Sequence, residues 1–507
     1  MRITGLGHAG MFIETAGGNI ICDPVLGPSF YGSWFPFPPD NRGLDWERLG
    51  RDADFLYISH RHRDHFDPRL LERYIRKDIE VLLPEYPTDD LEQDLRALGY
   101  DNITYAPAGE IIERGVLKIM ITPLRAPSDG PIGDSSLSVD DGTGSVLNQN
   151  DSHPPRPREA DGLRQAGRVL HPGLRRHLVP MVYDLPLDAK QNFARLKREA
   201  QNKRAMYYIE KVDAPHVFPM AGPPMFLRDE LFDFNGTGRN GESIFTDQKQ
   251  FLAHMNELAP PQYDGHLFVP GTLVTLEDRA LVSVEQTLYS EEELRHIFEE
   301  KWDYLEQQRA SRQQELRDEE ARRAPILPPE EMLAAIKEWW EPLLKKSRTI
   351  RLGVGGNVRF RIGELDMVVD FPPKAKVREY AGEECIYWYT IPADLVSTNI
   401  ADHEIDWSNS IFLSMQFSVG RSGKFNEFLT TFLKCLSVDR IEYVENWYQE
   451  QTDQTEDAEI GDWVVQRRCP HLRADLTRTG SVDEDGVLTC SMHDWKWDLK
   501  TGRCLST

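Results

Sequence analysis

Short apolar runs alternate with glycine and proline turns through the first 280 residues, which predicts many short strands. Gly17-Gly18 lies between two such runs and predicts a hairpin turn. The run Phe55–Ile58 predicts a short buried strand. The predicted strands are 3–6, 11–14, 19–22, 55–58, 79–83, 103–105, 111–112, 116–121, 135–139 and 145–147, and amphipathic helices are predicted at 68–77, 89–98 and 188–211. This mixture of elements predicts an α/β sandwich.

The second half of the chain has a different pattern. Residues 290–323 have an almost wholly helical composition, and the charged stretch 307–323 predicts a solvent-bridging connector. Prolines 325, 328 and 329 mark a boundary. Residues 330–436 then predict a separate α+β unit, with helices at 330–345 and 424–436 around alternating strands, and we expect no chemistry in it.

Composition and charge exclude several classes of partner. A chain of 507 residues predicts two to four domains. The net charge of −24 disfavours nucleic acid and anionic membranes, because both attract a positive surface. The sequence has no apolar run long enough for a transmembrane helix and no apolar signal-peptide core. Six cysteines in so long a chain form no disulfide framework, so we expect a cytoplasmic protein.

A dense group of metal-ligating residues follows the predicted strand at 55–58. His60, His62, Asp64 and His65 lie within six residues, and imidazole with carboxylate suits zinc, iron or manganese. A solvated polar loop is the alternative, and it is disfavoured because so many ligands follow a strand end. His8, between Gly7 and Gly10, is either a helper at this site or a plain turn residue. Asp64 and His8 are therefore the catalytic candidates.

A second strand end carries similar residues. Asp151 and His153 follow the predicted strand 145–147, and both are candidate metal ligands. The arginine-rich stretch 156–176 and the basic residues of 190–204 are compatible with an anionic substrate, although a solvated loop is the favoured explanation of the first stretch.

The last 40 residues carry the strongest motif. Cys469 and His471 form a Cys-x-His pair, and Cys490 and His493 form a Cys-x-x-His pair. Two thiolates on one iron and two imidazoles on the other are the ligands of a Rieske [2Fe–2S] cluster. Zinc is the alternative for two Cys and two His, and the Cys-x-His spacing in glycine-punctuated loops disfavours it. Such a cluster transfers single electrons, which a redox-inactive zinc ion cannot use. The Rieske motif therefore favours iron at the His60–His65 site.

The motif Ser59–His65, with Asp23 and Asp151, resembles the metallo-β-lactamase superfamily. Together with the Rieske motif, it resembles the CMP-N-acetylneuraminate hydroxylase family, in which the Rieske domain is N-terminal rather than C-terminal. Similar stretches are Val146–Asp151, His216–Gly222 and Pro270–Thr272. The resemblance implies a metallo-β-lactamase αββα sandwich, a helical connector, an α+β domain of sterol-carrier-like pattern and a small all-β Rieske domain, with predicted limits 1–285, 286–328, 329–438 and 439–507.

The resemblance also implies a ligand scheme. In the superfamily, residues matching His60 and His62 hold one metal, those matching Asp64 and His65 hold the other, and Asp151 bridges. Two further histidines of the dinuclear hydrolases are missing, since 122–129 holds none and Ala221 stands at the other position. The remaining sets are His60/His62/Asp151, the ligand type of non-haem iron oxygenases, or Asp64/His65/Asp151, or a di-iron site using both, with His153 as an extra ligand.

We therefore expect a Rieske-dependent non-haem iron monooxygenase that hydroxylates a polar small molecule, anionic or sugar-nucleotide-like. A reductase, a ferredoxin or a cytochrome b5-like protein would supply electrons through His471 or His493, and dioxygen would be the oxidant. The alternatives are a metallo-β-lactamase-type hydrolase with an accessory iron–sulfur domain, and an electron-transfer or binding protein with a degenerate first site. The sequence leaves the oligomeric state open, a homo-oligomer with electrons crossing between subunits included.

Overall fold

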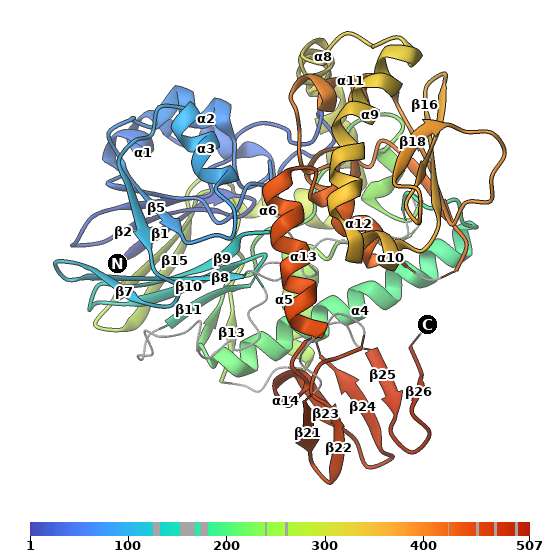
Figure 1. Cartoon of the computed structure of the whole chain (residues 1–507). Helices are drawn as coiled ribbons and strands as arrows, with labels where there is room; N and C mark the ends of the chain where they lie inside the picture. Colours follow the sequence, from blue (N-terminus) through green and yellow to red (C-terminus); the bar gives the residue numbers. More distant parts are fainter. Residues whose placement is uncertain are drawn as a thin grey trace.

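The computed structural model describes residues 1–124, 132–152, 168–172, 181–238, 241–258, 262–423, 425–452, 456–470, 474–491 and 495–506. Two sheets face each other in its N-terminal half (Figure 1). Strands β3 to β6 of the first sheet run parallel, and its other pairs are antiparallel. In order, this sheet holds β15 (Ala280–Gln286), β14 (Thr272–Glu277), β1 (Arg2–Gly7), β2 (Gly10–Glu14), β3 (Ile20–Cys22), β4 (Phe55–Tyr57), β5 (Glu80–Pro84) and β6 (Ile103–Ala106).

The second sheet is parallel from β10 to β13 and antiparallel from β10 to β7. Its order is β13 (Asp264–Gly265), β12 (His216–Val217), β11 (Arg168–Pro172), β10 (Ser145–Asn150), β9 (Asp134–Asp140), β8 (Leu117–Leu124) and β7 (Ile111–Arg114). Because the parallel strands share one direction, their carboxyl ends meet at one rim of the sandwich. Crevices at such strand ends commonly hold the functional site of α/β folds.

Apolar side chains bind these layers together. Alternate residues such as Ile13, Tyr57 and Val146 fill the space between the sheets. The opposite face of the first sheet is covered by α1 (Trp46–Asp52), α2 (Pro68–Tyr74) and α3 (Asp90–Ala97), and that of the second sheet by α4 (Leu187–Val212) and α5 (Gln248–Leu258). Short 3-10 turns cover Asp40–Gly43 and Phe232–Asn235. The predicted αββα sandwich is confirmed.

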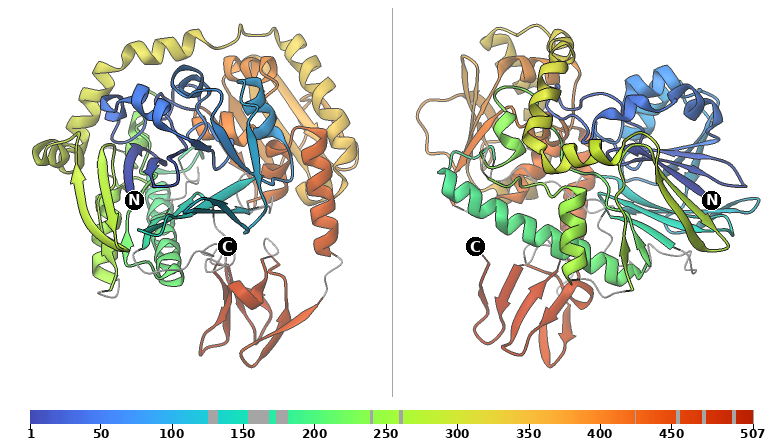
Figure 2. Two further views of the ribbon diagram at one scale, coloured as in Figure 1. Left: turned by 90° about the vertical axis from the view of Figure 1, so that its left-hand side faces the viewer. Right: turned by 180° about the vertical axis from the view of Figure 1, so that it is seen from behind.

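The connector is three helices rather than the single helix that the composition predicts. They are α6 (Glu291–Glu299), α7 (Lys301–Ser311) and α8 (Gln313–Ala321), with non-helical dihedrals at Glu300 and Arg312 between them. These breaks let the chain follow the surface of the sandwich in an arc (Figure 2). Charged residues of α8 pair with the first domain instead of facing only water, for example Glu319 with Arg69 at 2.6 Å.

The α+β unit is built on a mixed sheet of five strands, in which β16 and β19 are parallel and the other neighbours are antiparallel. Its order is β18 (Lys376–Glu379), β17 (Leu365–Asp370), β16 (Asn357–Ile362), β19 (Tyr387–Ile391) and β20 (Ser418–Arg421). Its helices are α9 (Pro329–Lys346), α10 (Arg348–Val354), α11 (Ala393–Ala401), the π-helical turn Ser408–Phe412, α12 (Glu427–Lys434) and α13 (Val438–Thr452). Its core is continuous with Trp34, Tyr183 and Phe226 of the first domain, so the two pack as neighbours over a shared apolar interior.

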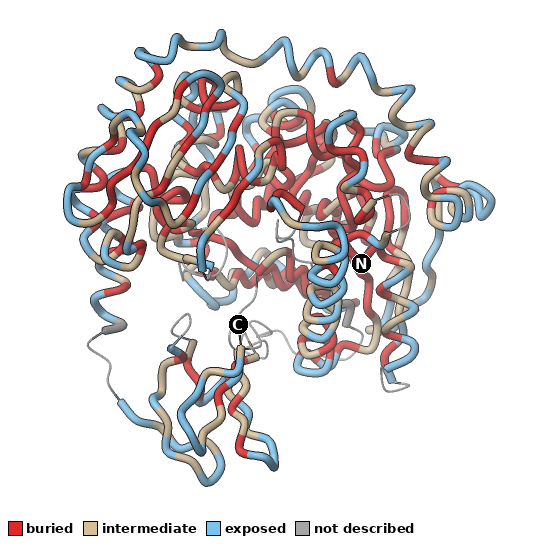
Figure 3. Tube along the Cα trace, turned by 90° about the vertical axis from the view of Figure 1, so that its right-hand side faces the viewer, coloured by how far each residue is buried: buried red, intermediate tan, exposed pale blue. Residues whose placement is uncertain are grey.

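A small all-β unit ends the chain, beyond α13. It holds β21 (Asp457–Ile460), β22 (Trp463–Gln466), α14 (Leu476–Thr479), β23 (Gly480–Val482), β24 (Val487–Cys490), β25 (Trp495–Asp498) and β26 (Arg503–Cys504). Figure 3 shows how few of its residues are buried compared with the rest of the chain. No helix in the described ranges is long and apolar enough to cross a membrane. The domain limits given above stay a prediction.

Candidate metal centre

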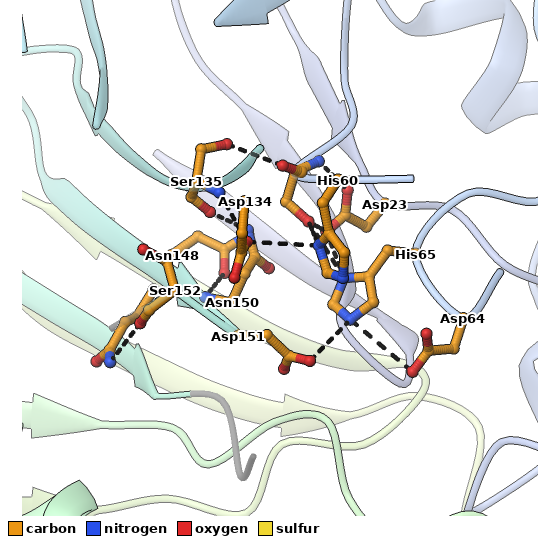
Figure 4. A network of polar contacts seen from close by, with 12 residues as sticks. Asp23, His60, Asp64, His65, Asp134, Ser135, Asn148, Asn150, Asp151 and Ser152 are labelled. Atoms are coloured by element: carbon orange, nitrogen blue, oxygen red, sulfur yellow. Dashed lines mark hydrogen bonds and ion pairs between the residues drawn. The ribbon is translucent and has the colours of Figure 1, made fainter. Parts of the chain in front are cut away.

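The histidine loop leaves β4 at the rim where the parallel strands end. The carbonyl of His62 accepts hydrogen bonds from the N–H groups of His65, at 2.9 Å, and Phe66, at 2.8 Å, so the loop turns back tightly. This turn brings the rings of His60 and His65 to a centroid separation of 4.2 Å. Both side chains are fully buried. Figure 4 shows the two imidazoles side by side, facing Asp151 from the end of β10.

A buried carboxylate holds the Nδ1 atom of each imidazole. His65 Nδ1 lies 2.9 Å from Asp23 Oδ2, and His60 Nδ1 lies 3.0 Å from Ser59 Oγ and 3.4 Å from Asp134 Oδ1. The hydroxyl of Ser59 donates to Asp23 at 2.6 Å and completes this layer. A carboxylate on one ring nitrogen fixes the tautomer and orientation of a histidine, which is the usual support of a metal-ligating imidazole.

The Nε2 atoms of the same two rings are oriented toward the rim. Both are buried, and neither makes a hydrogen bond within the described part of the chain. His65 Nε2 lies 3.8 Å from Asp151 Oδ2 and 4.0 Å from Asp64 Oδ2, and His8 Nε2 lies 3.0 Å from the same Asp64 oxygen. The described residues therefore form two overlapping groups of three: His60, His65 and Asp151, and His8, Asp64 and His65.

These groups fit a metal cation. Within each group, one donor atom per residue lies within 4.8 Å of the others, which is the span that a single ion can bridge. A buried imidazole nitrogen without a partner is costly, by about 1–3 kcal/mol, and a metal ion would satisfy it. Two imidazoles and a carboxylate are also the ligand type of non-haem iron sites with open positions.

The electrostatics of the pocket agree with this. Burial, with the neighbouring rings of His65 and His62, lowers the pKa of His60 and keeps it neutral, as a metal ligand must be. Burial by itself lowers the pKa of His65, but the carboxylates of Asp64, Asp23 and Asp151 outweigh it and raise this pKa to about 9. These carboxylates therefore favour a proton on His65 when no cation is bound, and a metal ion that binds its Nε2 atom would displace this proton.

The backbone around the site adopts an uncommon conformation. His8, Asp23, Asn150 and Ala221 all have positive φ, between 40° and 52°, although none is glycine. The N–H of Ala221 donates to the carbonyl of His8 at 3.0 Å, so two of these residues hold each other in place. Such residues cost about 1–3 kcal/mol each and cluster at functional sites, where the surrounding fold enforces them.

The structure brings the predicted residues together in a different grouping. His65, rather than His62, lies within ligand distance of His60 and Asp151. The His62 ring lies 4.5 Å from that of His60, and within the described ranges His62 belongs to neither group of three. His8 joins Asp64, as expected of a helper residue. His153 lies outside the described residues, so its role stays a prediction.

The α+β unit holds the histidine loop from outside, a role that its sequence does not reveal. The amide of Asn409 accepts from the N–H of Arg63 and donates to the carbonyl of Arg61, both at 3.3 Å, and so brackets His62. Arg61 also donates to Glu404 at 2.9 Å. Asn409 is 1% exposed. The expectation of no chemistry in this unit therefore overlooked its support of the loop, because contacts some 350 residues apart leave no local pattern.

The two cysteines of the predicted cluster motif lie in the core of the small β unit. Cys469 and Cys490 are buried with Leu476, Leu488 and Trp497. The Cys490 sulfur lies 3.6 Å from Thr479 Oγ1. His471 and His493 lie outside the described residues. Their assignment as cluster ligands stays a prediction.

Comparisons with known proteins cover all parts of the chain. Residues 2–128 match the model of the beta-lactamase superfamily domain, residues 332–450 the Rv3818-like, SCP2-like domain, and residues 452–507 the Rieske [2Fe-2S] domain. A Rieske 2Fe-2S iron-sulfur protein of Mycolicibacterium smegmatis is 40% identical over 523 residues, covering 100% of this chain and 98% of the relative. The chain belongs to this family. The Mycobacterium tuberculosis member, Rv3818, is also 40% identical, with the same coverage.

Family membership confirms the predicted fold class and the C-terminal position of the Rieske domain. The Rieske domain supports a [2Fe–2S] cluster in this chain, which is consistent with an oxidoreductase. A stretch of 118 residues, 22% of this chain and 19% of the relative, is 32% identical to cytidine monophosphate-N-acetylneuraminic acid hydroxylase of Mus musculus. CmlA, a diiron β-hydroxylase from Streptomyces venezuelae, is 16% identical with a TM-score of 0.34, and 53% of each chain is covered. A structural likeness of this size carries no functional argument.

Proposed function

We propose that this protein is a Rieske-dependent non-haem iron monooxygenase that hydroxylates a polar small molecule. The observation that carries the proposal is the pair of buried imidazoles, His60 and His65, each fixed at Nδ1 by a carboxylate and without a hydrogen bond at Nε2 in the described chain. The same chain carries a Rieske domain, whose single-electron chemistry has no use at a zinc hydrolase. The local similarity to a protein named as a hydroxylase adds support.

We assign the ligands from the geometry. His60, His65 and Asp151 would hold one iron, and His8 with Asp64 would extend the site toward a second. Iron held there supplies the activation of dioxygen, and the [2Fe–2S] cluster supplies electrons one at a time from a reductase, a ferredoxin or a cytochrome b5-like donor. Asp23 and Asp134 keep the two rings in the tautomer that presents Nε2. His8, bonded to Asp64 at 3.0 Å, is placed to orient this carboxylate or to hold a proton on it.

A cavity beside the histidine loop supports a polar substrate. It has a volume of about 280 Å³ and opens between the first domain, the connector and the α+β unit. Arg63, which precedes Asp64, lines it together with Glu404 and Asn409. Further lining groups of both charges are Asp67, Arg69, Glu319, Arg322, Arg323 and Asp402. Four arginines and four carboxylates suit a polar metabolite better than an apolar one, and the arginines would pair with its anionic groups.

The test is the reaction of the reduced full-length chain with dioxygen. The protein is reduced anaerobically, freed of reductant and mixed with aerated buffer, and oxygen uptake is followed with the Rieske EPR signal. His65→Ala should abolish the uptake that exceeds autoxidation of the cluster while leaving the EPR signal intact. His296→Ala, which removes a histidine on the exposed connector, is the matched control and should change neither. Equal uptake by wild type and His65→Ala would refute the proposal.

A further inference from the structure

A second cluster of two histidines and one aspartate lies on the sandwich, away from the metal centre. His216 begins β12, and Asp264 faces it directly in the parallel register of β13. His266 follows two residues after Asp264, and its N–H donates to the carbonyl of Val217 at 2.9 Å, which continues the pairing. Because side chains alternate along strands, all three project from the same face of the sheet. Their position is therefore set by strand register.

The cluster is separate from the metal centre. β10 to β13 run parallel, and the centre lies at their carboxyl ends, beyond Asn150 and near Ala221. His216 is the first residue of β12, on the amino-terminal side of the segment that leads to Ala221. Four residues lie between His216 and Ala221, and the cluster shares no residue with the two groups of three at the metal centre. One ion cannot serve both clusters.

The donor atoms already stand at ligand spacing. His216 Nδ1 lies 3.2 Å from His266 Nε2, and His266 Nε2 lies 3.3 Å from Asp264 Oδ2. Adjacent ligands at tetrahedral zinc, with bonds of about 2.0–2.1 Å, are about 3.3 Å apart. One donor atom from each of the three residues lies within 4.8 Å of the others. A hydrogen bond between the imidazoles and an ion pair of His266 with Asp264 would explain the two distances separately, whereas one cation explains both.

Neighbouring residues restrain one side of the cluster and leave the other side open to solvent. Phe218 stacks on the His266 ring at a centroid distance of 4.7 Å and limits its rotation. Asp264 is 69% exposed, which leaves a route from solvent to the cluster. The arrangement is a half-open, preformed site.

We propose that His216, Asp264 and His266 bind one late first-row divalent cation, with zinc as the expected ion. Two imidazoles and one carboxylate suit this class, and a solvent molecule would complete the coordination. The ion would fasten β13, an edge strand of two residues, to β12. This proposal does not depend on the iron assignment at the other rim.

The experiment uses Co²⁺ as a spectroscopic probe in the full-length chain. In a His65→Ala background, which disables the metal centre, Co²⁺ should bind with one equivalent per chain and give visible d–d bands of a low-coordinate site. His65→Ala/His266→Gln should lose that equivalent, whereas His65→Ala/His254→Gln, with a histidine changed on α5, should keep it. Zn²⁺ should displace Co²⁺ from the competent variants.

Two readouts distinguish a folding defect from a specific loss of Co²⁺ binding. The Rieske EPR signal reports an intact chain, and Asp264→Asn changes an exposed side chain with little risk to folding. Asp264→Asn should weaken Co²⁺ binding while leaving that signal unchanged. Retention of the full equivalent in the His266→Gln or Asp264→Asn background overturns the proposal, and so does the absence of any Co²⁺ equivalent in His65→Ala alone.

Discussion

The two clusters contain the same types of side chain, histidine and aspartate, at opposite rims of one sandwich. At the metal centre, Asp23 and Asp134 hold the imidazoles from behind, and His60 and His65 are fully buried. At the second cluster, His216 and His266 contact each other directly, and its carboxylate is largely exposed. The ligand types are alike, so the difference lies in the supporting layer and in access to water. We expect the supporting layer to tune a metal bound at the first centre, and the exposure of Asp264 to let an ion at the second cluster exchange with solvent.

The metal centre also has support from another domain. Asn409 brackets the histidine loop, and close to it a buried ion-pair network joins the α+β unit to α3. Arg440 bonds Asp90 of α3 at 2.7 Å and Asp406 at 3.0 Å, and it is 2% exposed. Burial raises the pKa of Asp406 by itself, but the facing Arg440 guanidinium and His62 outweigh it and lower this pKa. Asp406 is therefore held ionised behind the loop.

Breaking this network should have the largest effect on stability. Arg440→Leu leaves the buried carboxylate of Asp406 without its cation, which should cost about 3–5 kcal/mol in the free energy of unfolding. The matched change Arg195→Gln breaks an exposed pair with Glu199 and should cost about 0.3–0.5 kcal/mol. Denaturant unfolding with a tryptophan fluorescence readout measures both. Equal, small losses would mean that the network does not join the domains.

Removing one supporting carboxylate should have the next largest effect. Asp23→Asn keeps the shape but loses the charge that orients His65, so iron affinity at the centre should fall about 10–100-fold. Iron retention during chelator competition measures this. Asp264→Asn at the other rim should leave that retention unchanged. Iron retention equal to wild type in Asp23→Asn would show that the supporting layer does not distinguish the two clusters.

The bracket from the α+β unit should have the smallest effect of the three. Asn409→Ala removes both hydrogen bonds to the loop, at a cost of about 1 kcal/mol, or about fivefold in iron affinity. Because Asn409 acts only through the loop, the Rieske potential should not move, whereas the EPR signal of the central iron should broaden. Asn357→Ala, which removes a half-buried amide in the same unit, is the control. An unchanged EPR spectrum of the central iron in Asn409→Ala would contradict the claim that Asn409 positions the histidine loop.

The sandwich is predictable from the sequence because it depends on local patterns, and the candidate ligands are recognisable because they cluster in the chain. Apolar alternation marks β1 to β5, and His60 to His65 lie within one turn of the chain. Asp134 is different, because its approach to His60 depends on the pairing of β9 in the second sheet. Asn409 depends on how two domains dock. The breaks at Glu300 and Arg312 follow from the surface that the connector covers, which composition cannot show.

Iron content per chain, measured together with EPR, tests the central claim most directly. The full-length protein, purified anaerobically, should contain about three irons, or four if His8 and Asp64 complete a second site, with two of them in a cluster that gives a rhombic Rieske signal on reduction. His65→Ala should lose only the irons outside the cluster. Two irons together with stoichiometric zinc retained by His60, His65 and Asp151 would contradict the account and favour a hydrolase.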